Sequence, residues 1–305
     1  MTLDALADEL DARLPGRVAR AQPLAELTTY RLGGPLAVVV RVADDAELAA
    51  VAELVAKHDP AVLVVGRGSN LLVADSGFEG LGVVLTGTFE ELTIDTAAGR
   101  ARAGGAVPLP VLARQTAAAG LGGLEFFVGI PGSVGGAVRM NAGGHGRETR
   151  EVLDRAWVAD LRTGAAPIPR TPDELDLGYR HSDLSATDVV TGAELVGVAD
   201  DPAACGERID DVVRWRREHQ PGGANAGSVF RNPEGDSAGR LIDAAGLKGL
   251  RVGGATVSEK HANFFQADPG ATAGDVHALV REVQRRVRDD SGVCLQPELH
   301  MVGFG

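Results

Sequence analysis

Three side chains in this sequence lie in patterns that could carry out chemistry. Ser228 lies in "NAGSVFRNP", Arg180 in "YRHSD" and Glu298 in "QPELH". A nucleophilic serine needs a neighbouring base and usually a strained G-x-S-x-G elbow. Ser228 has no such elbow, and its nearest histidine in sequence, His219, ends a predicted helix. The sequence therefore disfavours a nucleophile and leaves a helix cap, a loop position or a proton donor. The following Val-Phe pair is more typical of a strand than of a capped helix.

Arg180 and Glu298 each have two interpretations. A guanidinium can bind a carboxylate through two hydrogen bonds and keeps its charge, but the residues alone favour a surface salt bridge for Arg180. Glu298 follows Pro297 in a mostly apolar predicted strand. Burial there could raise the pKa of its carboxyl group and keep it protonated as a hydrogen-bond donor. A charge at the strand edge, paired with a lysine, is equally consistent with the pattern.

Two glycine-rich loops suggest a ligand held by backbone. "GRGSN" (66–70) follows a predicted buried strand, but Leu71 replaces the third glycine of a dinucleotide fingerprint and no helix follows. This loop alone is equally consistent with a hairpin turn and with backbone N–H groups that face an anion. "GIPGSVGGAVRMNAGG" (129–144) is dense enough in glycine to let backbone approach a flat or charged ligand. Together the loops indicate a dinucleotide, without identifying which one.

Composition excludes several classes of protein. The 305 residues carry a formal charge of −12, which argues against a general nucleic-acid binder or a binder of acidic membranes. Cys205 and Cys294 lie far apart, so neither a disulfide framework nor a structural zinc site is expected, and no other metal site is predicted. The start of the chain is an acidic amphipathic helix rather than a signal peptide, and no apolar run is long enough to span a membrane. We therefore expect a cytoplasmic protein with no membrane partner.

Alternating helices and strands predict an α+β fold. Expected helices cover 1–14, 44–58 (capped by Asp44), 107–120, 200–220, 237–246 and 272–292. Expected strands cover 37–42, 61–65, several short runs in 86–103, 262–267, and 293–303 interrupted at Pro297. The charges of "RWRRE" (214–218) are interpreted as a solvated helix face. Seams near 86 and 200 predict three domains, at 1–85, 86–199 and 200–305.

Seven stretches, read in order, resemble the signatures of one enzyme family. They are "TTYRLGG", "GRGSNLL", "GLEFFVGIPGSVGGAVRMNAG", "YRHSD", "AGSVFRNP", "AGLKGLRVGGATVSEKHANFF" and "LQPELHMVG", and they cover most of 28–303. This series is similar to that of the UDP-N-acetylenolpyruvoylglucosamine reductase (UDP-N-acetylmuramate dehydrogenase) family, and its spacing is more like the shorter type II branch. The resemblance implies non-covalent FAD in an N-terminal domain of the p-cresol methylhydroxylase type, built from two α/β subdomains. It also implies a C-terminal α/β domain that binds the substrate.

The same resemblance implies a reaction and roles for the three side chains. NADPH would reduce the flavin, and UDP-N-acetylglucosamine enolpyruvate would then be reduced to UDP-N-acetylmuramate for peptidoglycan synthesis, by a monomer. Arg180 would bind the substrate carboxylate, Glu298 would stabilise the enolate, and Ser228 would donate the proton. A flavin oxidase of the same fold, or a catalytically silent flavin-binding paralogue, is the alternative. The presence of all three side chains argues against both.

Binding residues follow from the matched motifs. The cofactor-binding residues implied are Gly66, Arg67, Gly68, Ser69, Asn70, Leu71, Gly129, Ile130, Pro131, Gly132, Ser133, Val134, Gly135, Gly136, Asn141 and Gly143. The substrate-binding residues implied are Tyr179, His219, Asn232 and His261. His219 stands near where many relatives have a lysine, and His145 where a tyrosine is common. A neutral imidazole at 219 would weaken a phosphate contact unless Arg216 or Arg217 replaces it.

Overall fold

The computed structural model describes residues 2–164 and 166–304. Within this range the chain forms two compact units. Unit 1 comprises the described residues of 1–22, 36–67 and 79–214, and unit 2 comprises those of 23–35, 68–78 and 215–305. The predicted three-domain division stays a prediction. No helix in the described part of the chain is long and apolar enough to cross a membrane.

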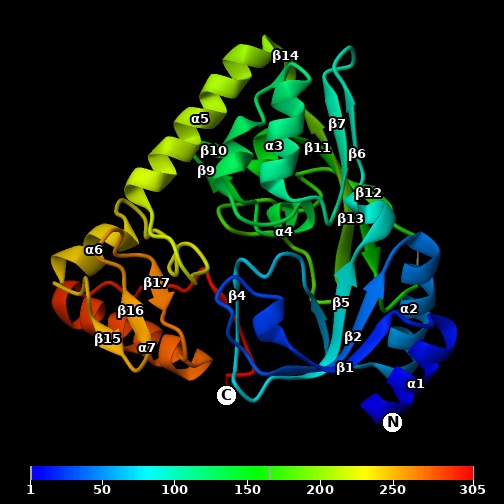
Figure 1. The fold of residues 1–305 in the computed structure, drawn as a ribbon, viewed down its shortest axis with the longest axis horizontal. Helices are drawn as coiled ribbons and strands as arrows, with labels where there is room; N and C mark the ends of the chain where they lie inside the picture. The colour runs from blue at the N-terminus through cyan, green and yellow to red at the C-terminus, as the bar shows by residue number, and fades with distance from the viewer. Residues whose placement is uncertain (1, 165, 305) are drawn as a thin grey trace. The chain divides into compact units, whose positions relative to one another are not determined.

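The first layer of unit 1 is a four-stranded sheet covered by two helices. The sheet has the order β1 (Val18–Pro23), β2 (Pro35–Val42), β5 (Phe78–Leu85), β3 (Val62–Val64). Helices α1 (Leu3–Arg13) and α2 (Asp45–His58) lie side by side and share one apolar core with it (Figure 1). The Asp44 carboxylate accepts the Glu47 N–H at 2.8 Å, which confirms the predicted cap of α2.

A five-stranded antiparallel sheet forms the rest of unit 1. Its order is β12 (Ile168–Arg170), β11 (Leu153–Asp160), β13 (Asp188–Val196), β7 (Arg100–Gly104), β6 (Leu92–Asp95). Helices α3 (Leu109–Ala118) and α4 (Val134–Arg139) share its core with the first turns of α5 (Pro202–His219). Two short pairs complete the strands, β8 (Leu121–Gly122) with β14 (Val198–Ala199), and β9 (Gly143–Gly144) with β10 (Arg147–Glu148). The short 3-10 helices are η1 (Leu24–Glu26, in unit 2), η2 (Gly87–Glu90), η3 (Glu125–Gly129) and η4 (Thr149–Glu151).

Unit 2 is built around one long amphipathic helix, α7 (Ala273–Ser291). The helix expected over 272–292 is confirmed, and its apolar stripe is fully buried: Val276, Leu279, Val280, Val283 and Val287. Against α7 lies the antiparallel sheet β15 (Arg251–Val252), β16 (Ala255–Val257), β17 (Phe265–Ala267). Helix α6 (Ala238–Ala244) joins the same core. A separate parallel pair is formed by β4 (Leu71–Val73) and β18 (His300–Val302).

Three predicted elements differ from the observed ones. The strand expected over 293–303 is limited to β18, because Pro297 has no N–H to donate and forms only an isolated bridge with Phe230. Glu298 therefore lies just before the strand rather than within it. The strand expected over 262–267 begins only at Phe265. The glycine loop 129–144 contains helix α4, which the Ser133 hydroxyl caps by accepting the Gly136 N–H.

The predicted solvated face of α5 is also only partly correct. Arg214, Arg217 and Glu218 are exposed, but Arg216 is half-buried and burial lowers the pKa of its guanidinium. Its Nε donates to the Gln220 side chain at 2.8 Å. Arg216 therefore packs into the protein at the end of this helix.

Candidate active site

The first glycine loop presents a row of unused backbone donors. In 66–70, no backbone N–H group donates to another described residue. Such consecutive N–H groups form a concavity that binds an anion such as a phosphate. Gly68 has φ +59°, and a Cβ there would lie 2.0 Å from the Leu27 carbonyl oxygen, so a side chain at this position is excluded. Unused N–H groups of this kind would suit the pyrophosphate of a dinucleotide.

The two glycine loops meet within unit 1. A Cβ on Gly66 would lie 2.7 Å from the Ser133 hydroxyl of the second loop. In that second loop the N–H groups of Val134 and Gly135 are already engaged, donating to the carbonyls of Val107 and Gly105. These two bonds fix the loop against the segment that directly follows β7. A bound dinucleotide would therefore meet a rigid second loop at this point.

Asn141 holds the second loop to the "YRHSD" turn. Its side chain is fully buried, and its Nδ2 donates to the Gly178 carbonyl at 2.9 Å and to the Glu148 carboxylate at 3.0 Å. Its Oδ1 accepts the Arg150 N–H at 2.9 Å. The Asn141 amide thus makes its hydrogen bonds to other residues of the protein. Two motifs that are nearly forty residues apart in sequence are brought together by one amide.

Arg180 lies on the surface of the second loop. Its guanidinium donates to the Gly143 carbonyl at 3.1 Å and to the Asn141 carbonyl at 3.5 Å, and lies 5.0 Å from the centre of the Tyr179 ring. These two carbonyl oxygens accept hydrogen bonds from the guanidinium and so hold its orientation. The arrangement therefore suits a group that binds a carboxylate. Tyr179 is 46% exposed.

Three residues other than glycine have left-handed backbone in this region. Asn141, His145 and Arg180 have φ of +38°, +54° and +54°. Side chains other than glycine seldom adopt this conformation, and such strain is concentrated at functional sites. The His145 ring also packs on the second loop, because a Cβ on Gly129 would lie 2.9 Å from its Nε2. His145 is therefore a packing residue of this loop in the structure.

Ser228 lies in extended backbone in unit 2. It forms an isolated bridge with Phe264 and begins no helix, so the helix-cap interpretation is wrong and the strand-like one is confirmed. The side chain is half-buried, and none of the described residues hydrogen-bonds its hydroxyl. The Ser228 hydroxyl group can therefore hydrogen-bond to a ligand without giving up a bond to a described residue.

Glu298 is tied to the segment that carries Ser228. Its backbone N–H donates to the Val229 carbonyl at 2.8 Å, next to Ser228 in the chain. Its own carbonyl accepts a hydrogen bond from the Asn70 side chain at 3.0 Å. Two residues that are seventy positions apart, Ser228 and Glu298, are thereby held on neighbouring backbones. The Glu298 side chain is half-buried.

Asn263 is a residue that the sequence interpretation missed. It is 3% exposed, and its side chain exchanges two hydrogen bonds with the Phe230 backbone, at 3.0 and 2.8 Å. Its own carbonyl accepts the Val229 N–H at 2.9 Å. The Asn263 side chain thus makes the two hydrogen bonds to Phe230 that the backbone of a neighbouring strand would otherwise make. The sequence signal that could have identified Asn263 is its position as a polar residue between Ala262 and two phenylalanines.

Further unsatisfied groups lie in two of the motif stretches of unit 2. The hydroxyls of Thr29 and Tyr30, in "TTYRLGG", and the Nε of Arg231, in "SVFRNP", are buried without a described hydrogen-bond partner. Burial also raises the pKa of the Tyr30 hydroxyl, which stays protonated as a donor. Buried polar groups are nearly always paired, so these donors favour a ligand at this unit.

The predicted substrate-binding residues differ in their surroundings. His219 is exposed at the end of α5, stacks on Trp215 at 4.6 Å and hydrogen-bonds its carbonyl through Nδ1 at 2.8 Å. Asn232 accepts the Ala238 N–H at 3.1 Å. His261 is half-buried, and burial lowers the pKa of its imidazole, as does the charge of the nearby Lys248. Lys248 is a cation that the sequence interpretation did not single out.

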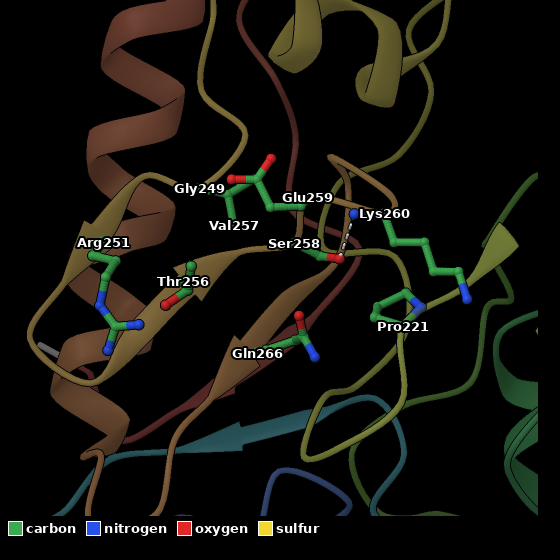
Figure 2. Close-up of a pocket in the computed structure, with 9 residues that line it drawn as sticks. All are labelled: Pro221, Gly249, Arg251, Thr256, Val257, Ser258, Glu259, Lys260 and Gln266. Carbon is green, nitrogen blue, oxygen red and sulfur yellow. Dashed lines mark hydrogen bonds between the residues drawn. The ribbon is translucent and has the colours of Figure 1, made fainter.

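A cavity of 420 Å³ lies elsewhere in unit 2 (Figure 2). Arg251, Thr256 and Gln266 form a row across β15, β16 and β17, where they are cross-strand neighbours. Arg251 pairs with Asp268, and Lys260 donates to the Arg217 carbonyl at 2.5 Å. None of the predicted catalytic or substrate-binding residues in the described part of the chain lines this cavity.

One group of potential metal ligands is already occupied by a cation from the protein. Ligand atoms of Glu125, Asp200 and Cys205 lie within 4.8 Å of one another. Arg208 lies among them, with its Nη2 at 2.7 Å from Glu125 and 3.1 Å from the Cys205 sulfur. Burial and the Glu125 carboxylate raise the pKa of the Cys205 thiol to about 11. A protonated thiol is a poor metal ligand, so these residues form an ion-pair cluster.

Comparisons with known proteins fit this geometry. A family model for an FAD binding domain matches residues 35–165, and a model for the UDP-N-acetylenolpyruvoylglucosamine reductase C-terminal domain matches 219–302. UDP-N-acetylenolpyruvoylglucosamine reductase from Methylorubrum extorquens strain PA1 is 44% identical over 99% of this chain and 98% of its own. The reductase from Syntrophotalea carbinolica is 42% identical over 98% of each chain. The chain belongs to the UDP-N-acetylenolpyruvoylglucosamine reductase family.

Solved structures agree with membership of this reductase family. The crystal structure of the reductase from Thermus caldophilus has a TM-score of 0.81 at 39% identity and covers 94% of this chain and 99% of its own. Phl p 4.0202, a glucose dehydrogenase, has a TM-score of 0.50 at 12% identity over 70% of this chain and shares the fold alone. The expected FAD-binding fold of the p-cresol methylhydroxylase type, followed by the C-terminal domain of this family, is confirmed. The protein is an FAD-dependent oxidoreductase.

Proposed function

We propose that this enzyme uses NADPH to reduce UDP-N-acetylglucosamine enolpyruvate to UDP-N-acetylmuramate, a precursor of peptidoglycan. The names of the relatives and the FAD-binding domain support this reaction. The chemistry that bound FAD would supply is hydride transfer, from NADPH to the terminal alkene carbon of the enolpyruvyl group. The unused N–H groups of 66–70 would hold its pyrophosphate. The exposed, unpaired thiol of Cys294 is typical of a reducing compartment, which supports a cytoplasmic location.

Arg180 is proposed to bind the carboxylate of the enolpyruvyl group. Hydride addition leaves negative charge on the carbon next to that carboxylate, and the charge spreads onto the carboxylate oxygens. A guanidinium that is already oriented by the Gly143 and Asn141 carbonyls would stabilise this charge without reorganising. The strained backbone of Arg180 supports the same role, because strain persists where a function requires a fixed geometry.

Glu298 and Ser228 are proposed to complete the reduction. The observation that carries this proposal is the 2.8 Å hydrogen bond from the Glu298 N–H to the Val229 carbonyl, which holds the two residues on adjacent backbones. A protonated Glu298 would donate a hydrogen bond to the enolate oxygen. Ser228 would give its proton to the carbanionic carbon, and its alkoxide would be reprotonated from solvent. A serine needs no neighbouring base for this role, because the carbanion itself is strongly basic.

The nucleotide part of the substrate is proposed to lie near Lys248 and His261. Because the pKa of His261 is lowered, its imidazole is neutral at physiological pH and can accept or donate a hydrogen bond. The Lys248 ammonium provides the positive charge that a diphosphate requires. Its Nζ donates to Asp243 at 2.7 Å on the exposed face of α6, so it can exchange this partner for a phosphate. Tyr179, Asn232 and His219 remain further proposed contacts.

Anaerobic stopped-flow measurement separates the steps of the proposed reaction. Ser228→Ala should be yellow and should be reduced by NADPH at the wild-type rate, but its reoxidation by the enolpyruvyl sugar should slow by about a hundredfold or more. Loss of the hydroxyl removes the proton donor and leaves FAD binding intact. Normal reoxidation in this variant would exclude Ser228 as the acid. A colourless wild-type protein, or NADPH oxidation that ignores the sugar, would exclude the reaction itself.

A further inference from the structure

Asn70 has an unusual position between the first glycine loop and Glu298. Residues 68–71 belong to unit 2, and Leu71 begins β4, which pairs in parallel with β18 through Leu71 opposite His300. The His300 N–H donates to the Asn70 carbonyl at 3.0 Å, as a parallel ladder in this register requires. The ladder is therefore regular up to Asn70.

The next rung of this ladder is made by a side chain. A regular parallel strand would have the Asn70 backbone N–H donate to the Glu298 carbonyl. In the structure the Asn70 Nδ2 donates to that carbonyl instead, at 3.0 Å. The backbone of Asn70 is thereby released from the strand, and its N–H stays among the unused donors of the loop.

The consequence for Glu298 is that both of its backbone polar groups are held by distant parts of the chain. Its N–H is held by the Val229 carbonyl, beside Ser228, and its carbonyl is held by the Asn70 amide. The peptide planes on both sides of its Cα are thus fixed. The direction in which the carboxyl group leaves the backbone follows from those planes.

We propose that Asn70 is a positioning residue for Glu298: its amide ends the β4–β18 ladder so that the loop can turn toward the cofactor while the Glu298 backbone stays fixed. The inference rests on the proposed function, because it assumes that Glu298 acts on the substrate. It assigns the side chain of Asn70 to the reductive step rather than to cofactor binding. A hydrogen bond of this kind matters because a shift of about 1 Å at a reacting group can cost a hundredfold in rate.

The test compares the two half-reactions of the holoenzyme in Asn70→Ala and in the isosteric Asn70→Asp, which keeps the size but lacks the N–H donor. Flavin content and reduction by NADPH should stay within about twofold of wild type, and reoxidation by the enolpyruvyl sugar should slow by about tenfold or more. Backbone hydrogen exchange of the peptide around Glu298 should accelerate, in apo-protein as well as holoenzyme. Loss of flavin or equal slowing of both steps would instead make Asn70 a cofactor ligand and overturn the proposal.

Gln284→Ala is the matched control, since its side-chain amide also donates to a backbone carbonyl of unit 2, that of Leu295, at 2.9 Å. This variant should lose stability but keep the reoxidation rate. In a Glu298→Ala background, Asn70→Ala should add no further slowing, because residues that act as a unit are not additive. Independent slowing there would overturn the inference and leave the proposed function standing. A Glu298→Ala enzyme that is reoxidised normally would remove both.

Discussion

A methyl group at position 66 tests the contact between the two glycine loops. The Cβ of Gly66→Ala would lie 2.7 Å from the Ser133 hydroxyl, closer than two such atoms can approach. The hydroxyl can move only by giving up its bond to the Gly136 N–H. Overpacking of this kind costs about 1–3 kcal/mol. We expect FAD affinity, measured by titration of apo-protein, to fall roughly fivefold to a hundredfold.

Two further variants make this prediction specific. Ser133→Ala in the Gly66→Ala background should restore part of the affinity, because it removes the atom that the new methyl group meets. Gly206→Ala is the control, since a Cβ there meets nothing within 4 Å and the position lies in helix α5. It should bind FAD normally and be slightly more stable. An unchanged FAD affinity in Gly66→Ala would contradict the prediction and would mean that the two loops move apart at this contact without a measurable cost.

At the same scale, the sequence excluded one role for Ser228, but it did not predict what the candidate residues contact. The unsuitability of Ser228 as a nucleophile followed from its neighbours alone. The structural use of the Asn141 and Asn70 side chains did not, because both depend on partners tens or hundreds of residues away. A local sequence pattern carries no information about such long-range hydrogen bonds. Asn263 was missed for the same reason.

Among the elements, helices with local signals agreed with prediction, and segments fixed by long-range pairing did not. The cap of α2 and the apolar stripe of α7 lie within one stretch of chain each. The segment 293–299 instead takes its form from separate contacts with Phe230, Val229 and Asn70. Pro297 signalled an interruption but not where the strand would resume. The segments that carry the candidate residues Ser228 and Glu298 belong to this second class, which is why their geometry had to come from the structure.

The N-terminus of α7 gives a prediction about acid stability. The Asp275 carboxylate accepts the N–H groups of Thr272 at 3.0 Å and Gly254 at 3.1 Å. These bonds lower its pKa below the ordinary 3.8. A depressed folded-state pKa contributes stability that is present above the ordinary value and is lost as pH falls through the folded value. Asp275→Asn should therefore be less stable than wild type at neutral pH, and the difference should shrink as the pH falls below the ordinary 3.8 of this carboxyl group.

Urea unfolding of both proteins across this pH range measures the effect. Asp290→Asn is the control, because Asp290 is exposed at the other end of the same helix. A negative charge there opposes the helix dipole, so its removal should be neutral or slightly stabilising. A pH-independent difference for Asp275→Asn would show that packing, rather than the carboxylate charge, holds this end of α7.

At the scale of the whole molecule, the charge of −12 opposes both of the proposed nucleotide ligands. Backbone N–H groups can bind phosphates at contact, but they exert little force on a distant anion. Salt screens repulsion beyond about 10 Å at roughly 0.1 M ionic strength. The second-order rate constant for flavin reduction by NADPH should therefore rise, by about twofold or more, from low salt to physiological salt. The first-order rate at saturating NADPH should not change, because it reports events after binding. A second-order constant that falls with salt would mean that local cations such as Lys248 dominate the field that the ligand meets.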